Sequence, residues 1–390
     1  MRKGWEYKKL EEICSSDLGK TLNKSKDVGN MRPYLCAINI LWDSIDLTTL
    51  KEACFKDDEI DRYTVKYGDL LVCEGGDTGR AAIWDRKEPI LYQNALHRLR
   101  FKEDVDARFI MYNLWHKKQI GEIDHKYSKG VTILHLVKSA LLSIPILLPP
   151  LSTQLAIVSE LDKINELIRL KKEQLKDFDN LAQSLFYEMF GDPVENEKGW
   201  KVKKLGDICA DITDGDHMPP PKSEFGIPFI TISDIDKDTR CLNFENTFYV
   251  PEDYYNNLKE NRKPQKGDLL YTVTGSYGIP VIVKTDKKFC FQRHIALLRP
   301  NKEILSTIFL CYWVLSDGVK FMADKVATGI AQKTVGLNSI RKFSCILPPL
   351  PLQRLFAQRI EQIEREKSEV QKSIQDLETL LASRMQYWFE

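Results

Sequence analysis

The feature that most constrains this chain is an internal repeat. Gly4-Trp5-Glu6-Tyr7-Lys8-Lys9-Leu10-Glu11-Glu12-Ile13-Cys14 returns as Gly199-Trp200-Lys201-Val202-Lys203-Lys204-Leu205-Gly206-Asp207-Ile208-Cys209. Pro149-Pro150-Leu151, followed by Gln154, returns as Pro348-Pro349-Leu350, followed by Gln353. A period of about 200 residues is far too long for a solenoid, whose repeats are 20 to 50 residues. The repeat therefore predicts two copies of a globular module, each with a further segment behind it.

Each module is predicted to be mixed α/β and rich in strands. Short runs of β-branched and aliphatic residues end at Gly, Asp or Pro, as strands usually do. A Gly-Asp turn leads into a buried strand in both copies, at 67–72 and 266–271, and a Gly-containing loop and a second strand follow. The further expected elements are strands at 229–232, 81–84 and 279–283, and short helices at 108–118 and 306–315.

The segments after the two Pro-Pro pairs are predicted to be long helices. Their apolar residues recur three and four apart, which is typical of a coiled-coil seam, with a break at Lys171 in the first helix and breaks at Lys367 and Arg384 in the second. The seam residues are Ile157, Leu161, Ile164, Ile168, Leu175, Phe178, Leu185, Phe356, Ile360, Ile363, Val370, Ile374, Leu377 and Leu381. The alternative is a helix packed on its own domain, but a helix roughly 60 Å long exceeds a 150-residue domain.

The direction of the pairing follows from chain connectivity. The first helix ends near Phe190 and the second module begins at Gly199, so the second helix must run back for the seams to meet. The predicted fold class is α+β, with two mixed α/β domains, two long helices pairing as an antiparallel coiled coil, and an internal pseudo-two-fold repeat. The predicted segments are 1–150 and 192–349 for the domains and 151–191 and 350–390 for the helices.

Composition excludes several classes of protein. Nine cysteines without a CxxC pair indicate free thiols in a reducing compartment, and six histidines show no metal-ligand spacing. No apolar run approaches 18 residues, so a membrane span is not expected. Walker-type, HExxH and amino-methyltransferase motifs do not occur in the sequence. We therefore predict no catalytic residue and no metal ligand, and interpret the chain as a binding protein.

Several features together resemble the DNA-specificity (S) subunits of type I restriction–modification systems. They are the Gly-Trp-x-x-Lys-Lys-Leu-x-x-Ile entry, the Gly-Asp-Leu-Leu strand with its Gly-containing loop, and Gln93-Asn94 with its counterpart Gln292-Arg293. The Pro-Pro-Leu-x-x-Gln that opens each helix and the link Met189-Phe190-Gly191-Asp192-Pro193 also match. The resemblance covers essentially the whole chain.

The resemblance implies a non-catalytic subunit that binds double-stranded DNA in the prokaryotic cytoplasm. Each module would be a target-recognition domain for one half of a split target, and the helices would set the spacing. Two modification subunits would bind the helices, carry S-adenosylmethionine and methylate adenine at N6. Restriction and translocase subunits, with ATP and Mg, would complete the complex, and this chain would hold no cofactor itself.

The candidate DNA-contacting residues lie in the polar, Gly-bearing loops of both modules, because sequence is read by side chains on base edges. Arg or Lys on guanine and Asn or Gln on adenine are the usual pairings. In the first module the candidates are Lys20, Thr21, Asn23, Lys24, Asp77, Thr78, Arg80, Gln93, Asn94, Lys129 and Thr132. In the second they are Asp216, His217, Lys222, Ser276, Tyr277, Gln292, Arg293, His294, Thr328, Gln332 and Lys333.

The two sets of loops differ in chemistry, which predicts an asymmetric target. Leu134-His135-Leu136 stands where the second copy has Lys333-Thr334-Val335, and the family commonly has a basic residue there. For each candidate the alternative is a solvated surface loop.

Two other function classes stay open at this point. The net charge of +1 is compatible with an adaptor that holds two protein-binding heads on a rod. A freestanding enzyme with an unfamiliar site is the third possibility. A salt titration separates DNA binding from the adaptor, because phosphate neutralisation makes affinity fall steeply with salt.

Overall fold

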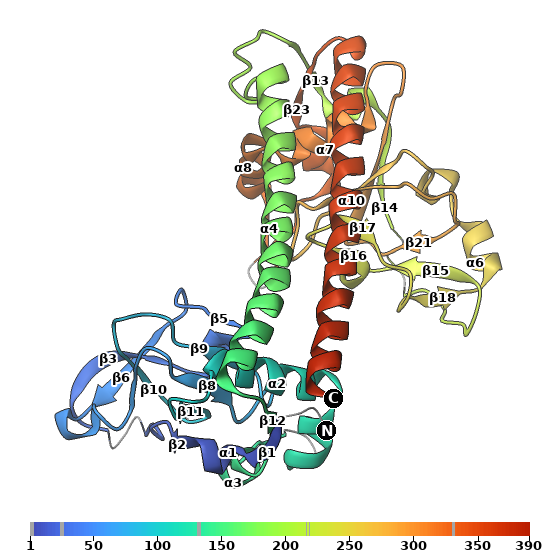
Figure 1. Cartoon of the computed structure of the whole chain (residues 1–390). Coiled ribbons are helices and arrows are strands. Elements are labelled where there is room, and N and C mark those ends of the chain that lie inside the picture. Colours follow the sequence, from blue (N-terminus) through green and yellow to red (C-terminus); the bar gives the residue numbers. More distant parts are fainter. Residues whose placement is uncertain (1–3, 24–26, 131–133, 216, 218, 330–331) are drawn as a thin grey trace. The chain divides into compact units, whose positions relative to one another are not determined.

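The computed structural model describes residues 4–23, 27–130, 134–215, 217, 219–329 and 332–390. They form two compact units (Figure 1). Unit 1 comprises residues 1–172 and 372–390, and unit 2 comprises residues 173–371. We call residues 4–150 head 1 and residues 192–349 head 2. Each unit therefore holds one head together with a part of each long helix.

Head 1 is built from two four-stranded sheets and two smaller strand pairs. The sheets have the orders β6-β3-β10-β7 and β2-β11-β8-β9, and the pairs are β1-β12 and β4-β5. The strands are β1 (Glu6–Lys9), β2 (Cys14–Leu18), β3 (Asn30–Leu35), β4 (Ile40–Leu41), β5 (Ser44–Ile45), β6 (Lys51–Phe55), β7 (Thr64–Val65), β8 (Leu70–Cys73), β9 (Ala81–Ile83), β10 (Ile90–Tyr92), β11 (Leu96–Phe101) and β12 (Pro145–Leu148). The helices are α1 (Leu10–Ile13), α2 (Ala107–Gln119) and α3 (Lys138–Leu142), with short turns η1 (Ala37–Asn39), η2 (Asp57–Glu59) and η3 (Ile123–Tyr127).

Head 2 repeats this arrangement. Its sheets have the orders β14-β22-β19-β20 and β18-β15-β21, and its pairs are β13-β23 and β16-β17. The strands are β13 (Lys201–Lys204), β14 (Cys209–Asp214), β15 (Ile227–Ile230), β16 (Ile235–Asp236), β17 (Cys241–Leu242), β18 (Phe248–Val250), β19 (Leu269–Thr272), β20 (Pro280–Ile282), β21 (Cys290–Phe291), β22 (Ile295–Pro300) and β23 (Ser344–Leu347). The helices are α5 (Leu205–Ile208), α6 (Glu252–Asn257), α7 (Thr307–Leu315), α8 (Asp317–Val326) and α9 (Leu337–Arg341), with turns η4 (Ile232–Asp234) and η5 (Glu260–Arg262).

The sheet orders confirm the predicted internal repeat: β2-β11-β8-β9 matches β14-β22-β19-β20, and β6-β3-β10 matches β18-β15-β21, with β7 added in head 1. Each head also contains one parallel strand pair at the same place in the repeat. It is β3 with β10 in head 1 and β15 with β21 in head 2. The helix after the last long strand, α2 or α7, packs on the neighbouring sheet, which buries β8 and β19 completely. A strand buried on both faces has no polar alternation, which explains the apolar runs in the sequence.

The repeated Gly-Asp-Leu-Leu motif has a structural function in both heads. Asp69 is buried and forms two hydrogen bonds with the guanidinium of Arg100, at 2.7 and 2.6 Å. Asp268 is buried and pairs with Arg299 in the same way, at 3.0 and 2.8 Å. The hydrogen bond that Arg299 donates to Asp268 raises the pKa of Arg299 more than partial burial lowers it, so the net effect raises that pKa. The motif therefore fixes the turn before the buried strand to the neighbouring long strand.

The repeated Pro-Pro-Leu-x-x-Gln motif also has a structural function. Gln154 and Gln353 are fully buried in the first turn of each long helix. The Gln154 side chain accepts from Asp106 N at 2.8 Å and donates to Pro149 O at 2.8 Å. The Gln353 side chain accepts from Ser306 N at 2.9 Å and donates to Pro348 O at 2.8 Å. Each glutamine thus joins the start of a long helix to the segment before α2 or α7.

The long helices are α4 (Leu151–Phe190) and α10 (Leu350–Phe389), and they pair in both units. In unit 1, Glu160 pairs with Arg384 and Lys172 with Glu378, the latter at 2.8 Å. Residue numbers rise along one helix as they fall along the other, so the pairing is antiparallel, as predicted. In unit 2, Lys367 lies 2.8 Å from Asp179.

Most of the predicted seam is buried, but its register changes at the end of α4. Ile157, Leu161, Ile164, Ile168, Phe356, Ile360, Ile363, Val370, Ile374 and Leu381 are buried, while Leu175, Phe178, Leu185 and Leu377 are half-buried. At this end of α4 the fully buried side chain is that of Phe186 and not that of the predicted seam residue Leu185. Its ring lies 5.7 Å from Phe309 of α7 and 5.8 Å from Phe356 of α10. Head 2 therefore shares one hydrophobic core with the helix ends, and this core sets the register.

None of the described helices is long and apolar enough to cross a membrane. Within the same described ranges, no group of three His, Cys, Asp or Glu side chains is arranged to hold a metal ion.

Candidate nucleic-acid interface

Three predicted loop segments of head 2 are joined in one row, and Gly215 of the remaining segment lies against the backbone of Phe291 and Gln292. Val273 N donates to His294 O at 2.9 Å, which joins the loop after β19 to the loop before β22. Gly275 N donates to Lys333 O at 3.0 Å. Thr334 in turn forms a β-bridge with Thr328, so the last loop folds back on itself beside the row. Backbone hydrogen bonds thus hold residues 292–294, 273–275, 328 and 333–335 side by side.

Head 1 has the same row, with its first loop included. Lys20 N donates to Tyr92 O at 3.2 Å, and Asn94 N donates to Lys20 O at 2.9 Å. Glu74 N donates to Ala95 O at 2.9 Å, and Leu136 N donates to Glu74 O at 2.7 Å. His135 then bridges Lys129, as Thr334 bridges Thr328 in head 2. The structure therefore brings together loops that the sequence places more than 100 residues apart.

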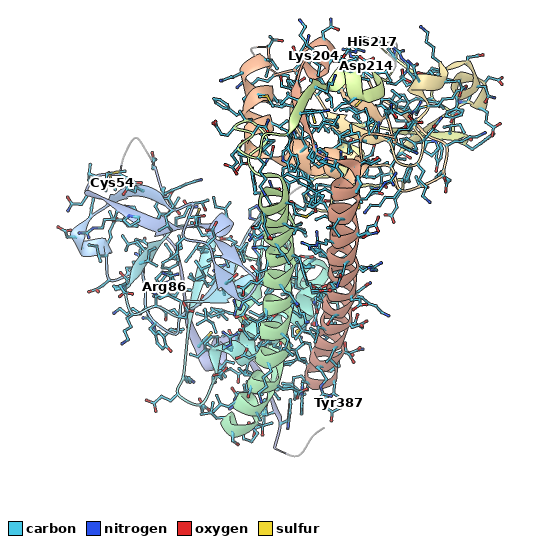
Figure 2. The ribbon with its side chains drawn as sticks, turned by 90° about the horizontal axis from the view of Figure 1, so that it is seen from above. Cys54, Arg86, Lys204, Asp214, His217 and Tyr387 are labelled. Carbon is cyan, nitrogen blue, oxygen red and sulfur yellow. The ribbon has the colours of Figure 1, made fainter. Side chains whose placement is uncertain are left out.

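Most candidates of head 2 are presented to solvent. Lys222, Ser276, Arg293, Thr328, Gln332 and Lys333 are exposed, and Tyr277, Gln292 and His294 are half-buried. Burial and, second, the charge of Arg293 lower the pKa of His294, so this imidazole is neutral at pH 7 and can accept a hydrogen bond. His217 is exposed, and its ring lies 3.0 Å from the Asp214 carboxylate (Figure 2).

Two candidates of head 1 are internal. Thr78 is fully buried and donates to Asp124 at 2.7 Å. Lys20 is buried, and its ammonium contacts Glu59 at 2.7 Å and Cys54 O at 3.0 Å. Burial lowers the pKa of Lys20. The hydrogen bond to Glu59 and the nearby carboxylate of Asp27 outweigh burial, so the pKa is raised. In this structure both side chains hold loops in place instead of facing solvent.

The remaining candidates of head 1 differ in exposure. Thr21, Asn23 and Lys129 are exposed, while Asp77, Gln93 and Asn94 are half-buried. Arg80 is half-buried and donates to Ala37 O at 2.9 Å, so part of its guanidinium is already used within the head. Asn94 Nδ2 lies 3.4 Å from Thr21 Oγ1. Lys24, Thr132 and Asp216 lie outside the described residues.

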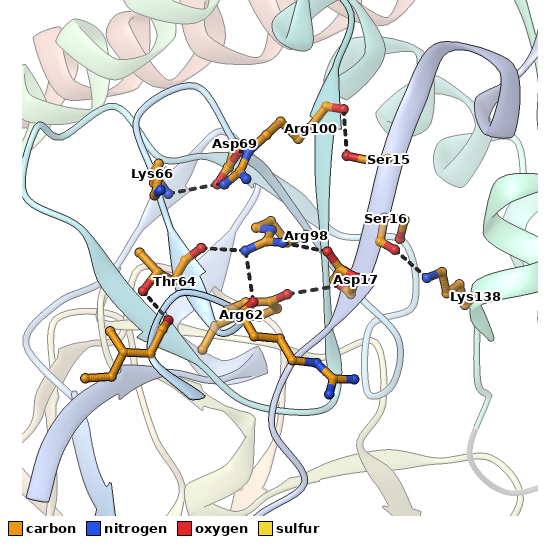
Figure 3. A network of polar contacts seen from close by, with 12 residues as sticks. Ser15, Ser16, Asp17, Arg62, Thr64, Lys66, Asp69, Arg98, Arg100 and Lys138 are labelled. Carbon is orange, nitrogen blue, oxygen red and sulfur yellow. Dashed lines mark hydrogen bonds and ion pairs between the residues drawn. The ribbon is translucent and has the colours of Figure 1, made fainter. Parts of the chain in front are cut away.

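A polar network behind the row of head 1 supports it (Figure 3). Arg98 is buried, pairs with Asp17 at 2.6 Å and donates to Thr64 O at 2.6 Å. It also donates to Arg62 O at 3.1 Å. Lys138 of α3 donates to Ser16 O on β2. The network ties the strands that carry the loops to each other, so the loops start from fixed positions.

Comparison with known proteins decides the family. The model for the type I restriction modification DNA specificity domain matches residues 2–177 and again residues 197–379. The chain belongs to this family. The specificity subunit of the type I restriction enzyme EcoBI of Escherichia coli is 24% identical over 80% of this chain and 70% of its own length. The MjaIX specificity subunit of Methanocaldococcus jannaschii is 23% identical over 97% of this chain and 91% of its own length.

Solved structures show the same fold. One of them is a chain of a type I R-M system solved to explain complex assembly and conformational transition. It has a TM-score of 0.62 at 19% identity, and the match covers 100% of this chain and 98% of that one. The S subunit of the type I system of M. genitalium has a TM-score of 0.51 at 14% identity, covering 99% of this chain and 96% of that one. The protein is thus a type I specificity subunit, a DNA-recognition subunit without catalytic activity of its own.

The specificity subunit also displays two apolar side chains that the sequence reasoning missed. Phe225 is 82% exposed and Val28 is 60% exposed, and each directly precedes a glycine with positive φ. Gly29 (φ +132°) and Gly226 (φ +135°) lie against a carbonyl of the neighbouring strand, where a Cβ atom would come within 2.2 and 2.3 Å of the oxygen. Both heads therefore hold an apolar residue outward on a tight turn. The sequence carries a signal for these two residues, because in both modules an apolar residue directly precedes a glycine in the same loop.

Proposed function

We propose that each head of this specificity subunit reads one half of a bipartite, asymmetric DNA target. The paired helices α4 and α10 would set the spacing between the half-sites. The chain would also bind two adenine N6-methyltransferase subunits in the cytoplasm of a prokaryote, and restriction subunits in the full complex. S-adenosylmethionine, and ATP with Mg for restriction, would belong to those partners.

The observation that carries this proposal is the duplicated loop row. Each head offers the same row of backbone-linked loops, but the side chains differ between the heads. Head 2 presents Arg293 and Lys333, which suit guanine or phosphate, whereas head 1 presents Asn94 and Thr21. Two equivalent scaffolds with different side chains would read two different sequences.

Replacement of Arg293 by alanine tests the assignment of the row. The exposed guanidinium belongs to the head 2 row, so its loss is expected to weaken binding of the cognate duplex by about 1–3 kcal/mol. The measurement is the dissociation constant of the subunit with its methyltransferase partners, by gel shift at a fixed salt concentration. Lys266→Ala, which removes an exposed cation of head 2 outside the row, is the control and is expected to bind as the wild type does. Equal binding by both variants and the wild type would remove Arg293 from the interface.

Replacement of Phe225 by alanine tests the apolar tip of head 2. Apolar side chains at DNA interfaces contact thymine methyl groups or insert between base steps. If Phe225 makes such a contact, the variant is expected to lose about tenfold in affinity for the cognate duplex, with its salt dependence unchanged. An exposed side chain adds little to folding, so the melting temperature should stay the same. An unchanged affinity would show that the tip does not reach DNA.

A further inference from the structure

Head 2 contains a pocket of about 410 Å³ beside its loop row. Lys237 and Arg240, from the turn between β16 and β17, form one wall, and Lys320 of α8 contributes to another. The Gly-containing loop contributes Tyr277. Lys237 Nζ donates to Ser276 Oγ at 3.2 Å, so the pocket directly adjoins a residue of the candidate interface.

The pocket has an excess of positive charge. Its lining contains three cationic side chains and one carboxylate, Asp324, which already accepts a hydrogen bond from the Tyr277 hydroxyl. Arg240 lies 3.2 Å from Asp179, but the same carboxylate also pairs with Lys367 at 2.8 Å. Lys367 also lies 3.4 Å from Glu364, and Lys320 of the pocket lies 3.5 Å from the exposed Asp317 carboxylate, a surface pair that solvent screens. The local field favours an anionic ligand.

The lining of the pocket includes a tyrosine whose hydroxyl is buried and unpartnered among the described residues. Tyr271 is 1% exposed, and its hydroxyl has no hydrogen-bond partner among the described residues. Burial raises the pKa of Tyr271, so the hydroxyl stays protonated at neutral pH and can donate. Gly278 (φ +95°) also lines the pocket, and a Cβ atom there would lie 3.8 Å from the hydroxyl oxygen, in ordinary van der Waals contact. A buried donor without an acceptor is costly unless a water or ligand satisfies it.

Head 1 fills the equivalent space. Thr78 donates to Asp124 there, as Tyr277 does to Asp324 in head 2. The Ile123 side chain covers Gly79 and would lie 2.7 Å from a Cβ atom at that glycine. Lys118 spans the remaining gap, at 3.0 Å from Asp77 and 2.7 Å from Asp124. The smaller Ala323 stands beside Asp324 where Ile123 stands beside Asp124, so the pocket is a property of head 2.

We infer that this pocket binds a phosphate group, held by Lys237, Lys320 and the Tyr271 hydroxyl. Three donors around one anion suit the three free oxygens of a phosphate monoester or the two of a phosphodiester. The group can belong to the backbone of the bound DNA or to a free phosphate compound. The first of these sources rests on the proposed function, and the second does not.

Two variants and one control test the inference in two arms. Lys237→Gln with Lys320→Gln removes two exposed charges, and Tyr271→Phe removes the hydroxyl alone. Lys259→Gln with Lys266→Gln removes two exposed charges of head 2 outside the pocket. In the first arm, inorganic phosphate replaces chloride at constant ionic strength, and the melting temperature of the full chain is measured. In the second arm, affinity of the subunit with its partners for the cognate duplex is measured from 50 to 200 mM salt.

A ligand that binds the folded state raises the melting temperature, so phosphate is expected to stabilise the wild type and the control. Both pocket variants should lose this shift. If the ligand is a DNA phosphate, the lysine variant should also show a salt slope smaller by about 1 than the control. Loss of the shift with an unchanged slope would assign the pocket to a free phosphate compound. If neither arm separates the pocket variants from the control, the inference is wrong. Failure of the wild type to bind DNA would contradict the proposed function. The melting-temperature shift with phosphate would then decide alone whether the pocket binds phosphate.

Discussion

Replacing Phe356 with alanine is expected to lower the free energy of unfolding by about 3–5 kcal/mol, because it opens a cavity where α10, α4 and head 2 meet. Phe356 is 0% exposed, and its ring centroid lies 5.3 Å from those of Phe190 on α4 and Tyr312 on α7. The remaining rings come from two elements, α4 and α7, so they cannot collapse into the site without moving these helices. The measurement is urea unfolding of the full chain, followed by circular dichroism.

Leu355 is the matched control for this prediction. It is the preceding residue of the same helix, but it is 43% exposed. Leu355→Ala is expected to change the free energy of unfolding by no more than about 0.5 kcal/mol, as surface substitutions usually do. Equal destabilisation by the two variants would mean that the helix does not pack through Phe356, and the pairing of α4 with α10 in unit 2 would be wrong.

The second large effect is expected from a matched insertion in the two long helices. One heptad would be added between Lys172 and Glu173 and another between Gln371 and Lys372, the points at which the chain divides into its two units. Seven residues preserve the phase of the seam and lengthen each helix by about 10 Å at 1.5 Å per residue. At about 3.4 Å per base pair, the preferred spacer should grow by about three base pairs.

The insertion is measured by gel shift of the complex on duplexes whose half-sites are separated by the native spacer or by one to six additional base pairs. The variant is expected to bind the native spacer at least tenfold more weakly than the wild type and to bind the spacer with three added pairs best. A heptad in α4 alone is the control, because it displaces the seam against α10 and should impair binding to every duplex. An unchanged spacer preference in the matched variant would show that the helices do not set the spacing.

The parts of the fold that could be predicted from the sequence are those encoded by local pattern. The repeat of Gly-Asp-Leu-Leu predicts a turn and a buried strand in each head, and the heptads after Pro149 and Pro348 predict the long helices. The register at the end of α4 could not be predicted in this way. Phe186 and Leu185 are both apolar, and contact with Phe309 of α7, distant in the sequence, decides which of them is buried.

The candidate interface was predictable as a set of loops but not residue by residue. Lys20 and Thr78 look like surface residues in the sequence, since their partners Glu59 and Asp124 lie 39 and 46 residues away. The pocket of head 2 depends on Ala323 of α8, which lies where head 1 has Ile123 of η3. The sequence does not show the effect of this difference, because it depends on how α8 and η3 pack beside the Gly-containing loops. Long-range pairing therefore decides which polar residues are free to bind.

The central claim is that one chain reads two separate half-sites at a fixed interval. Single-molecule sequencing of methylated adenines, in cells that carry this subunit with its partner methyltransferase, measures target and spacer together. We predict methylation at one asymmetric sequence made of two specified blocks separated by a constant number of unspecified base pairs. Methylation at a single continuous motif, or at two blocks whose separation varies from site to site, would contradict the account.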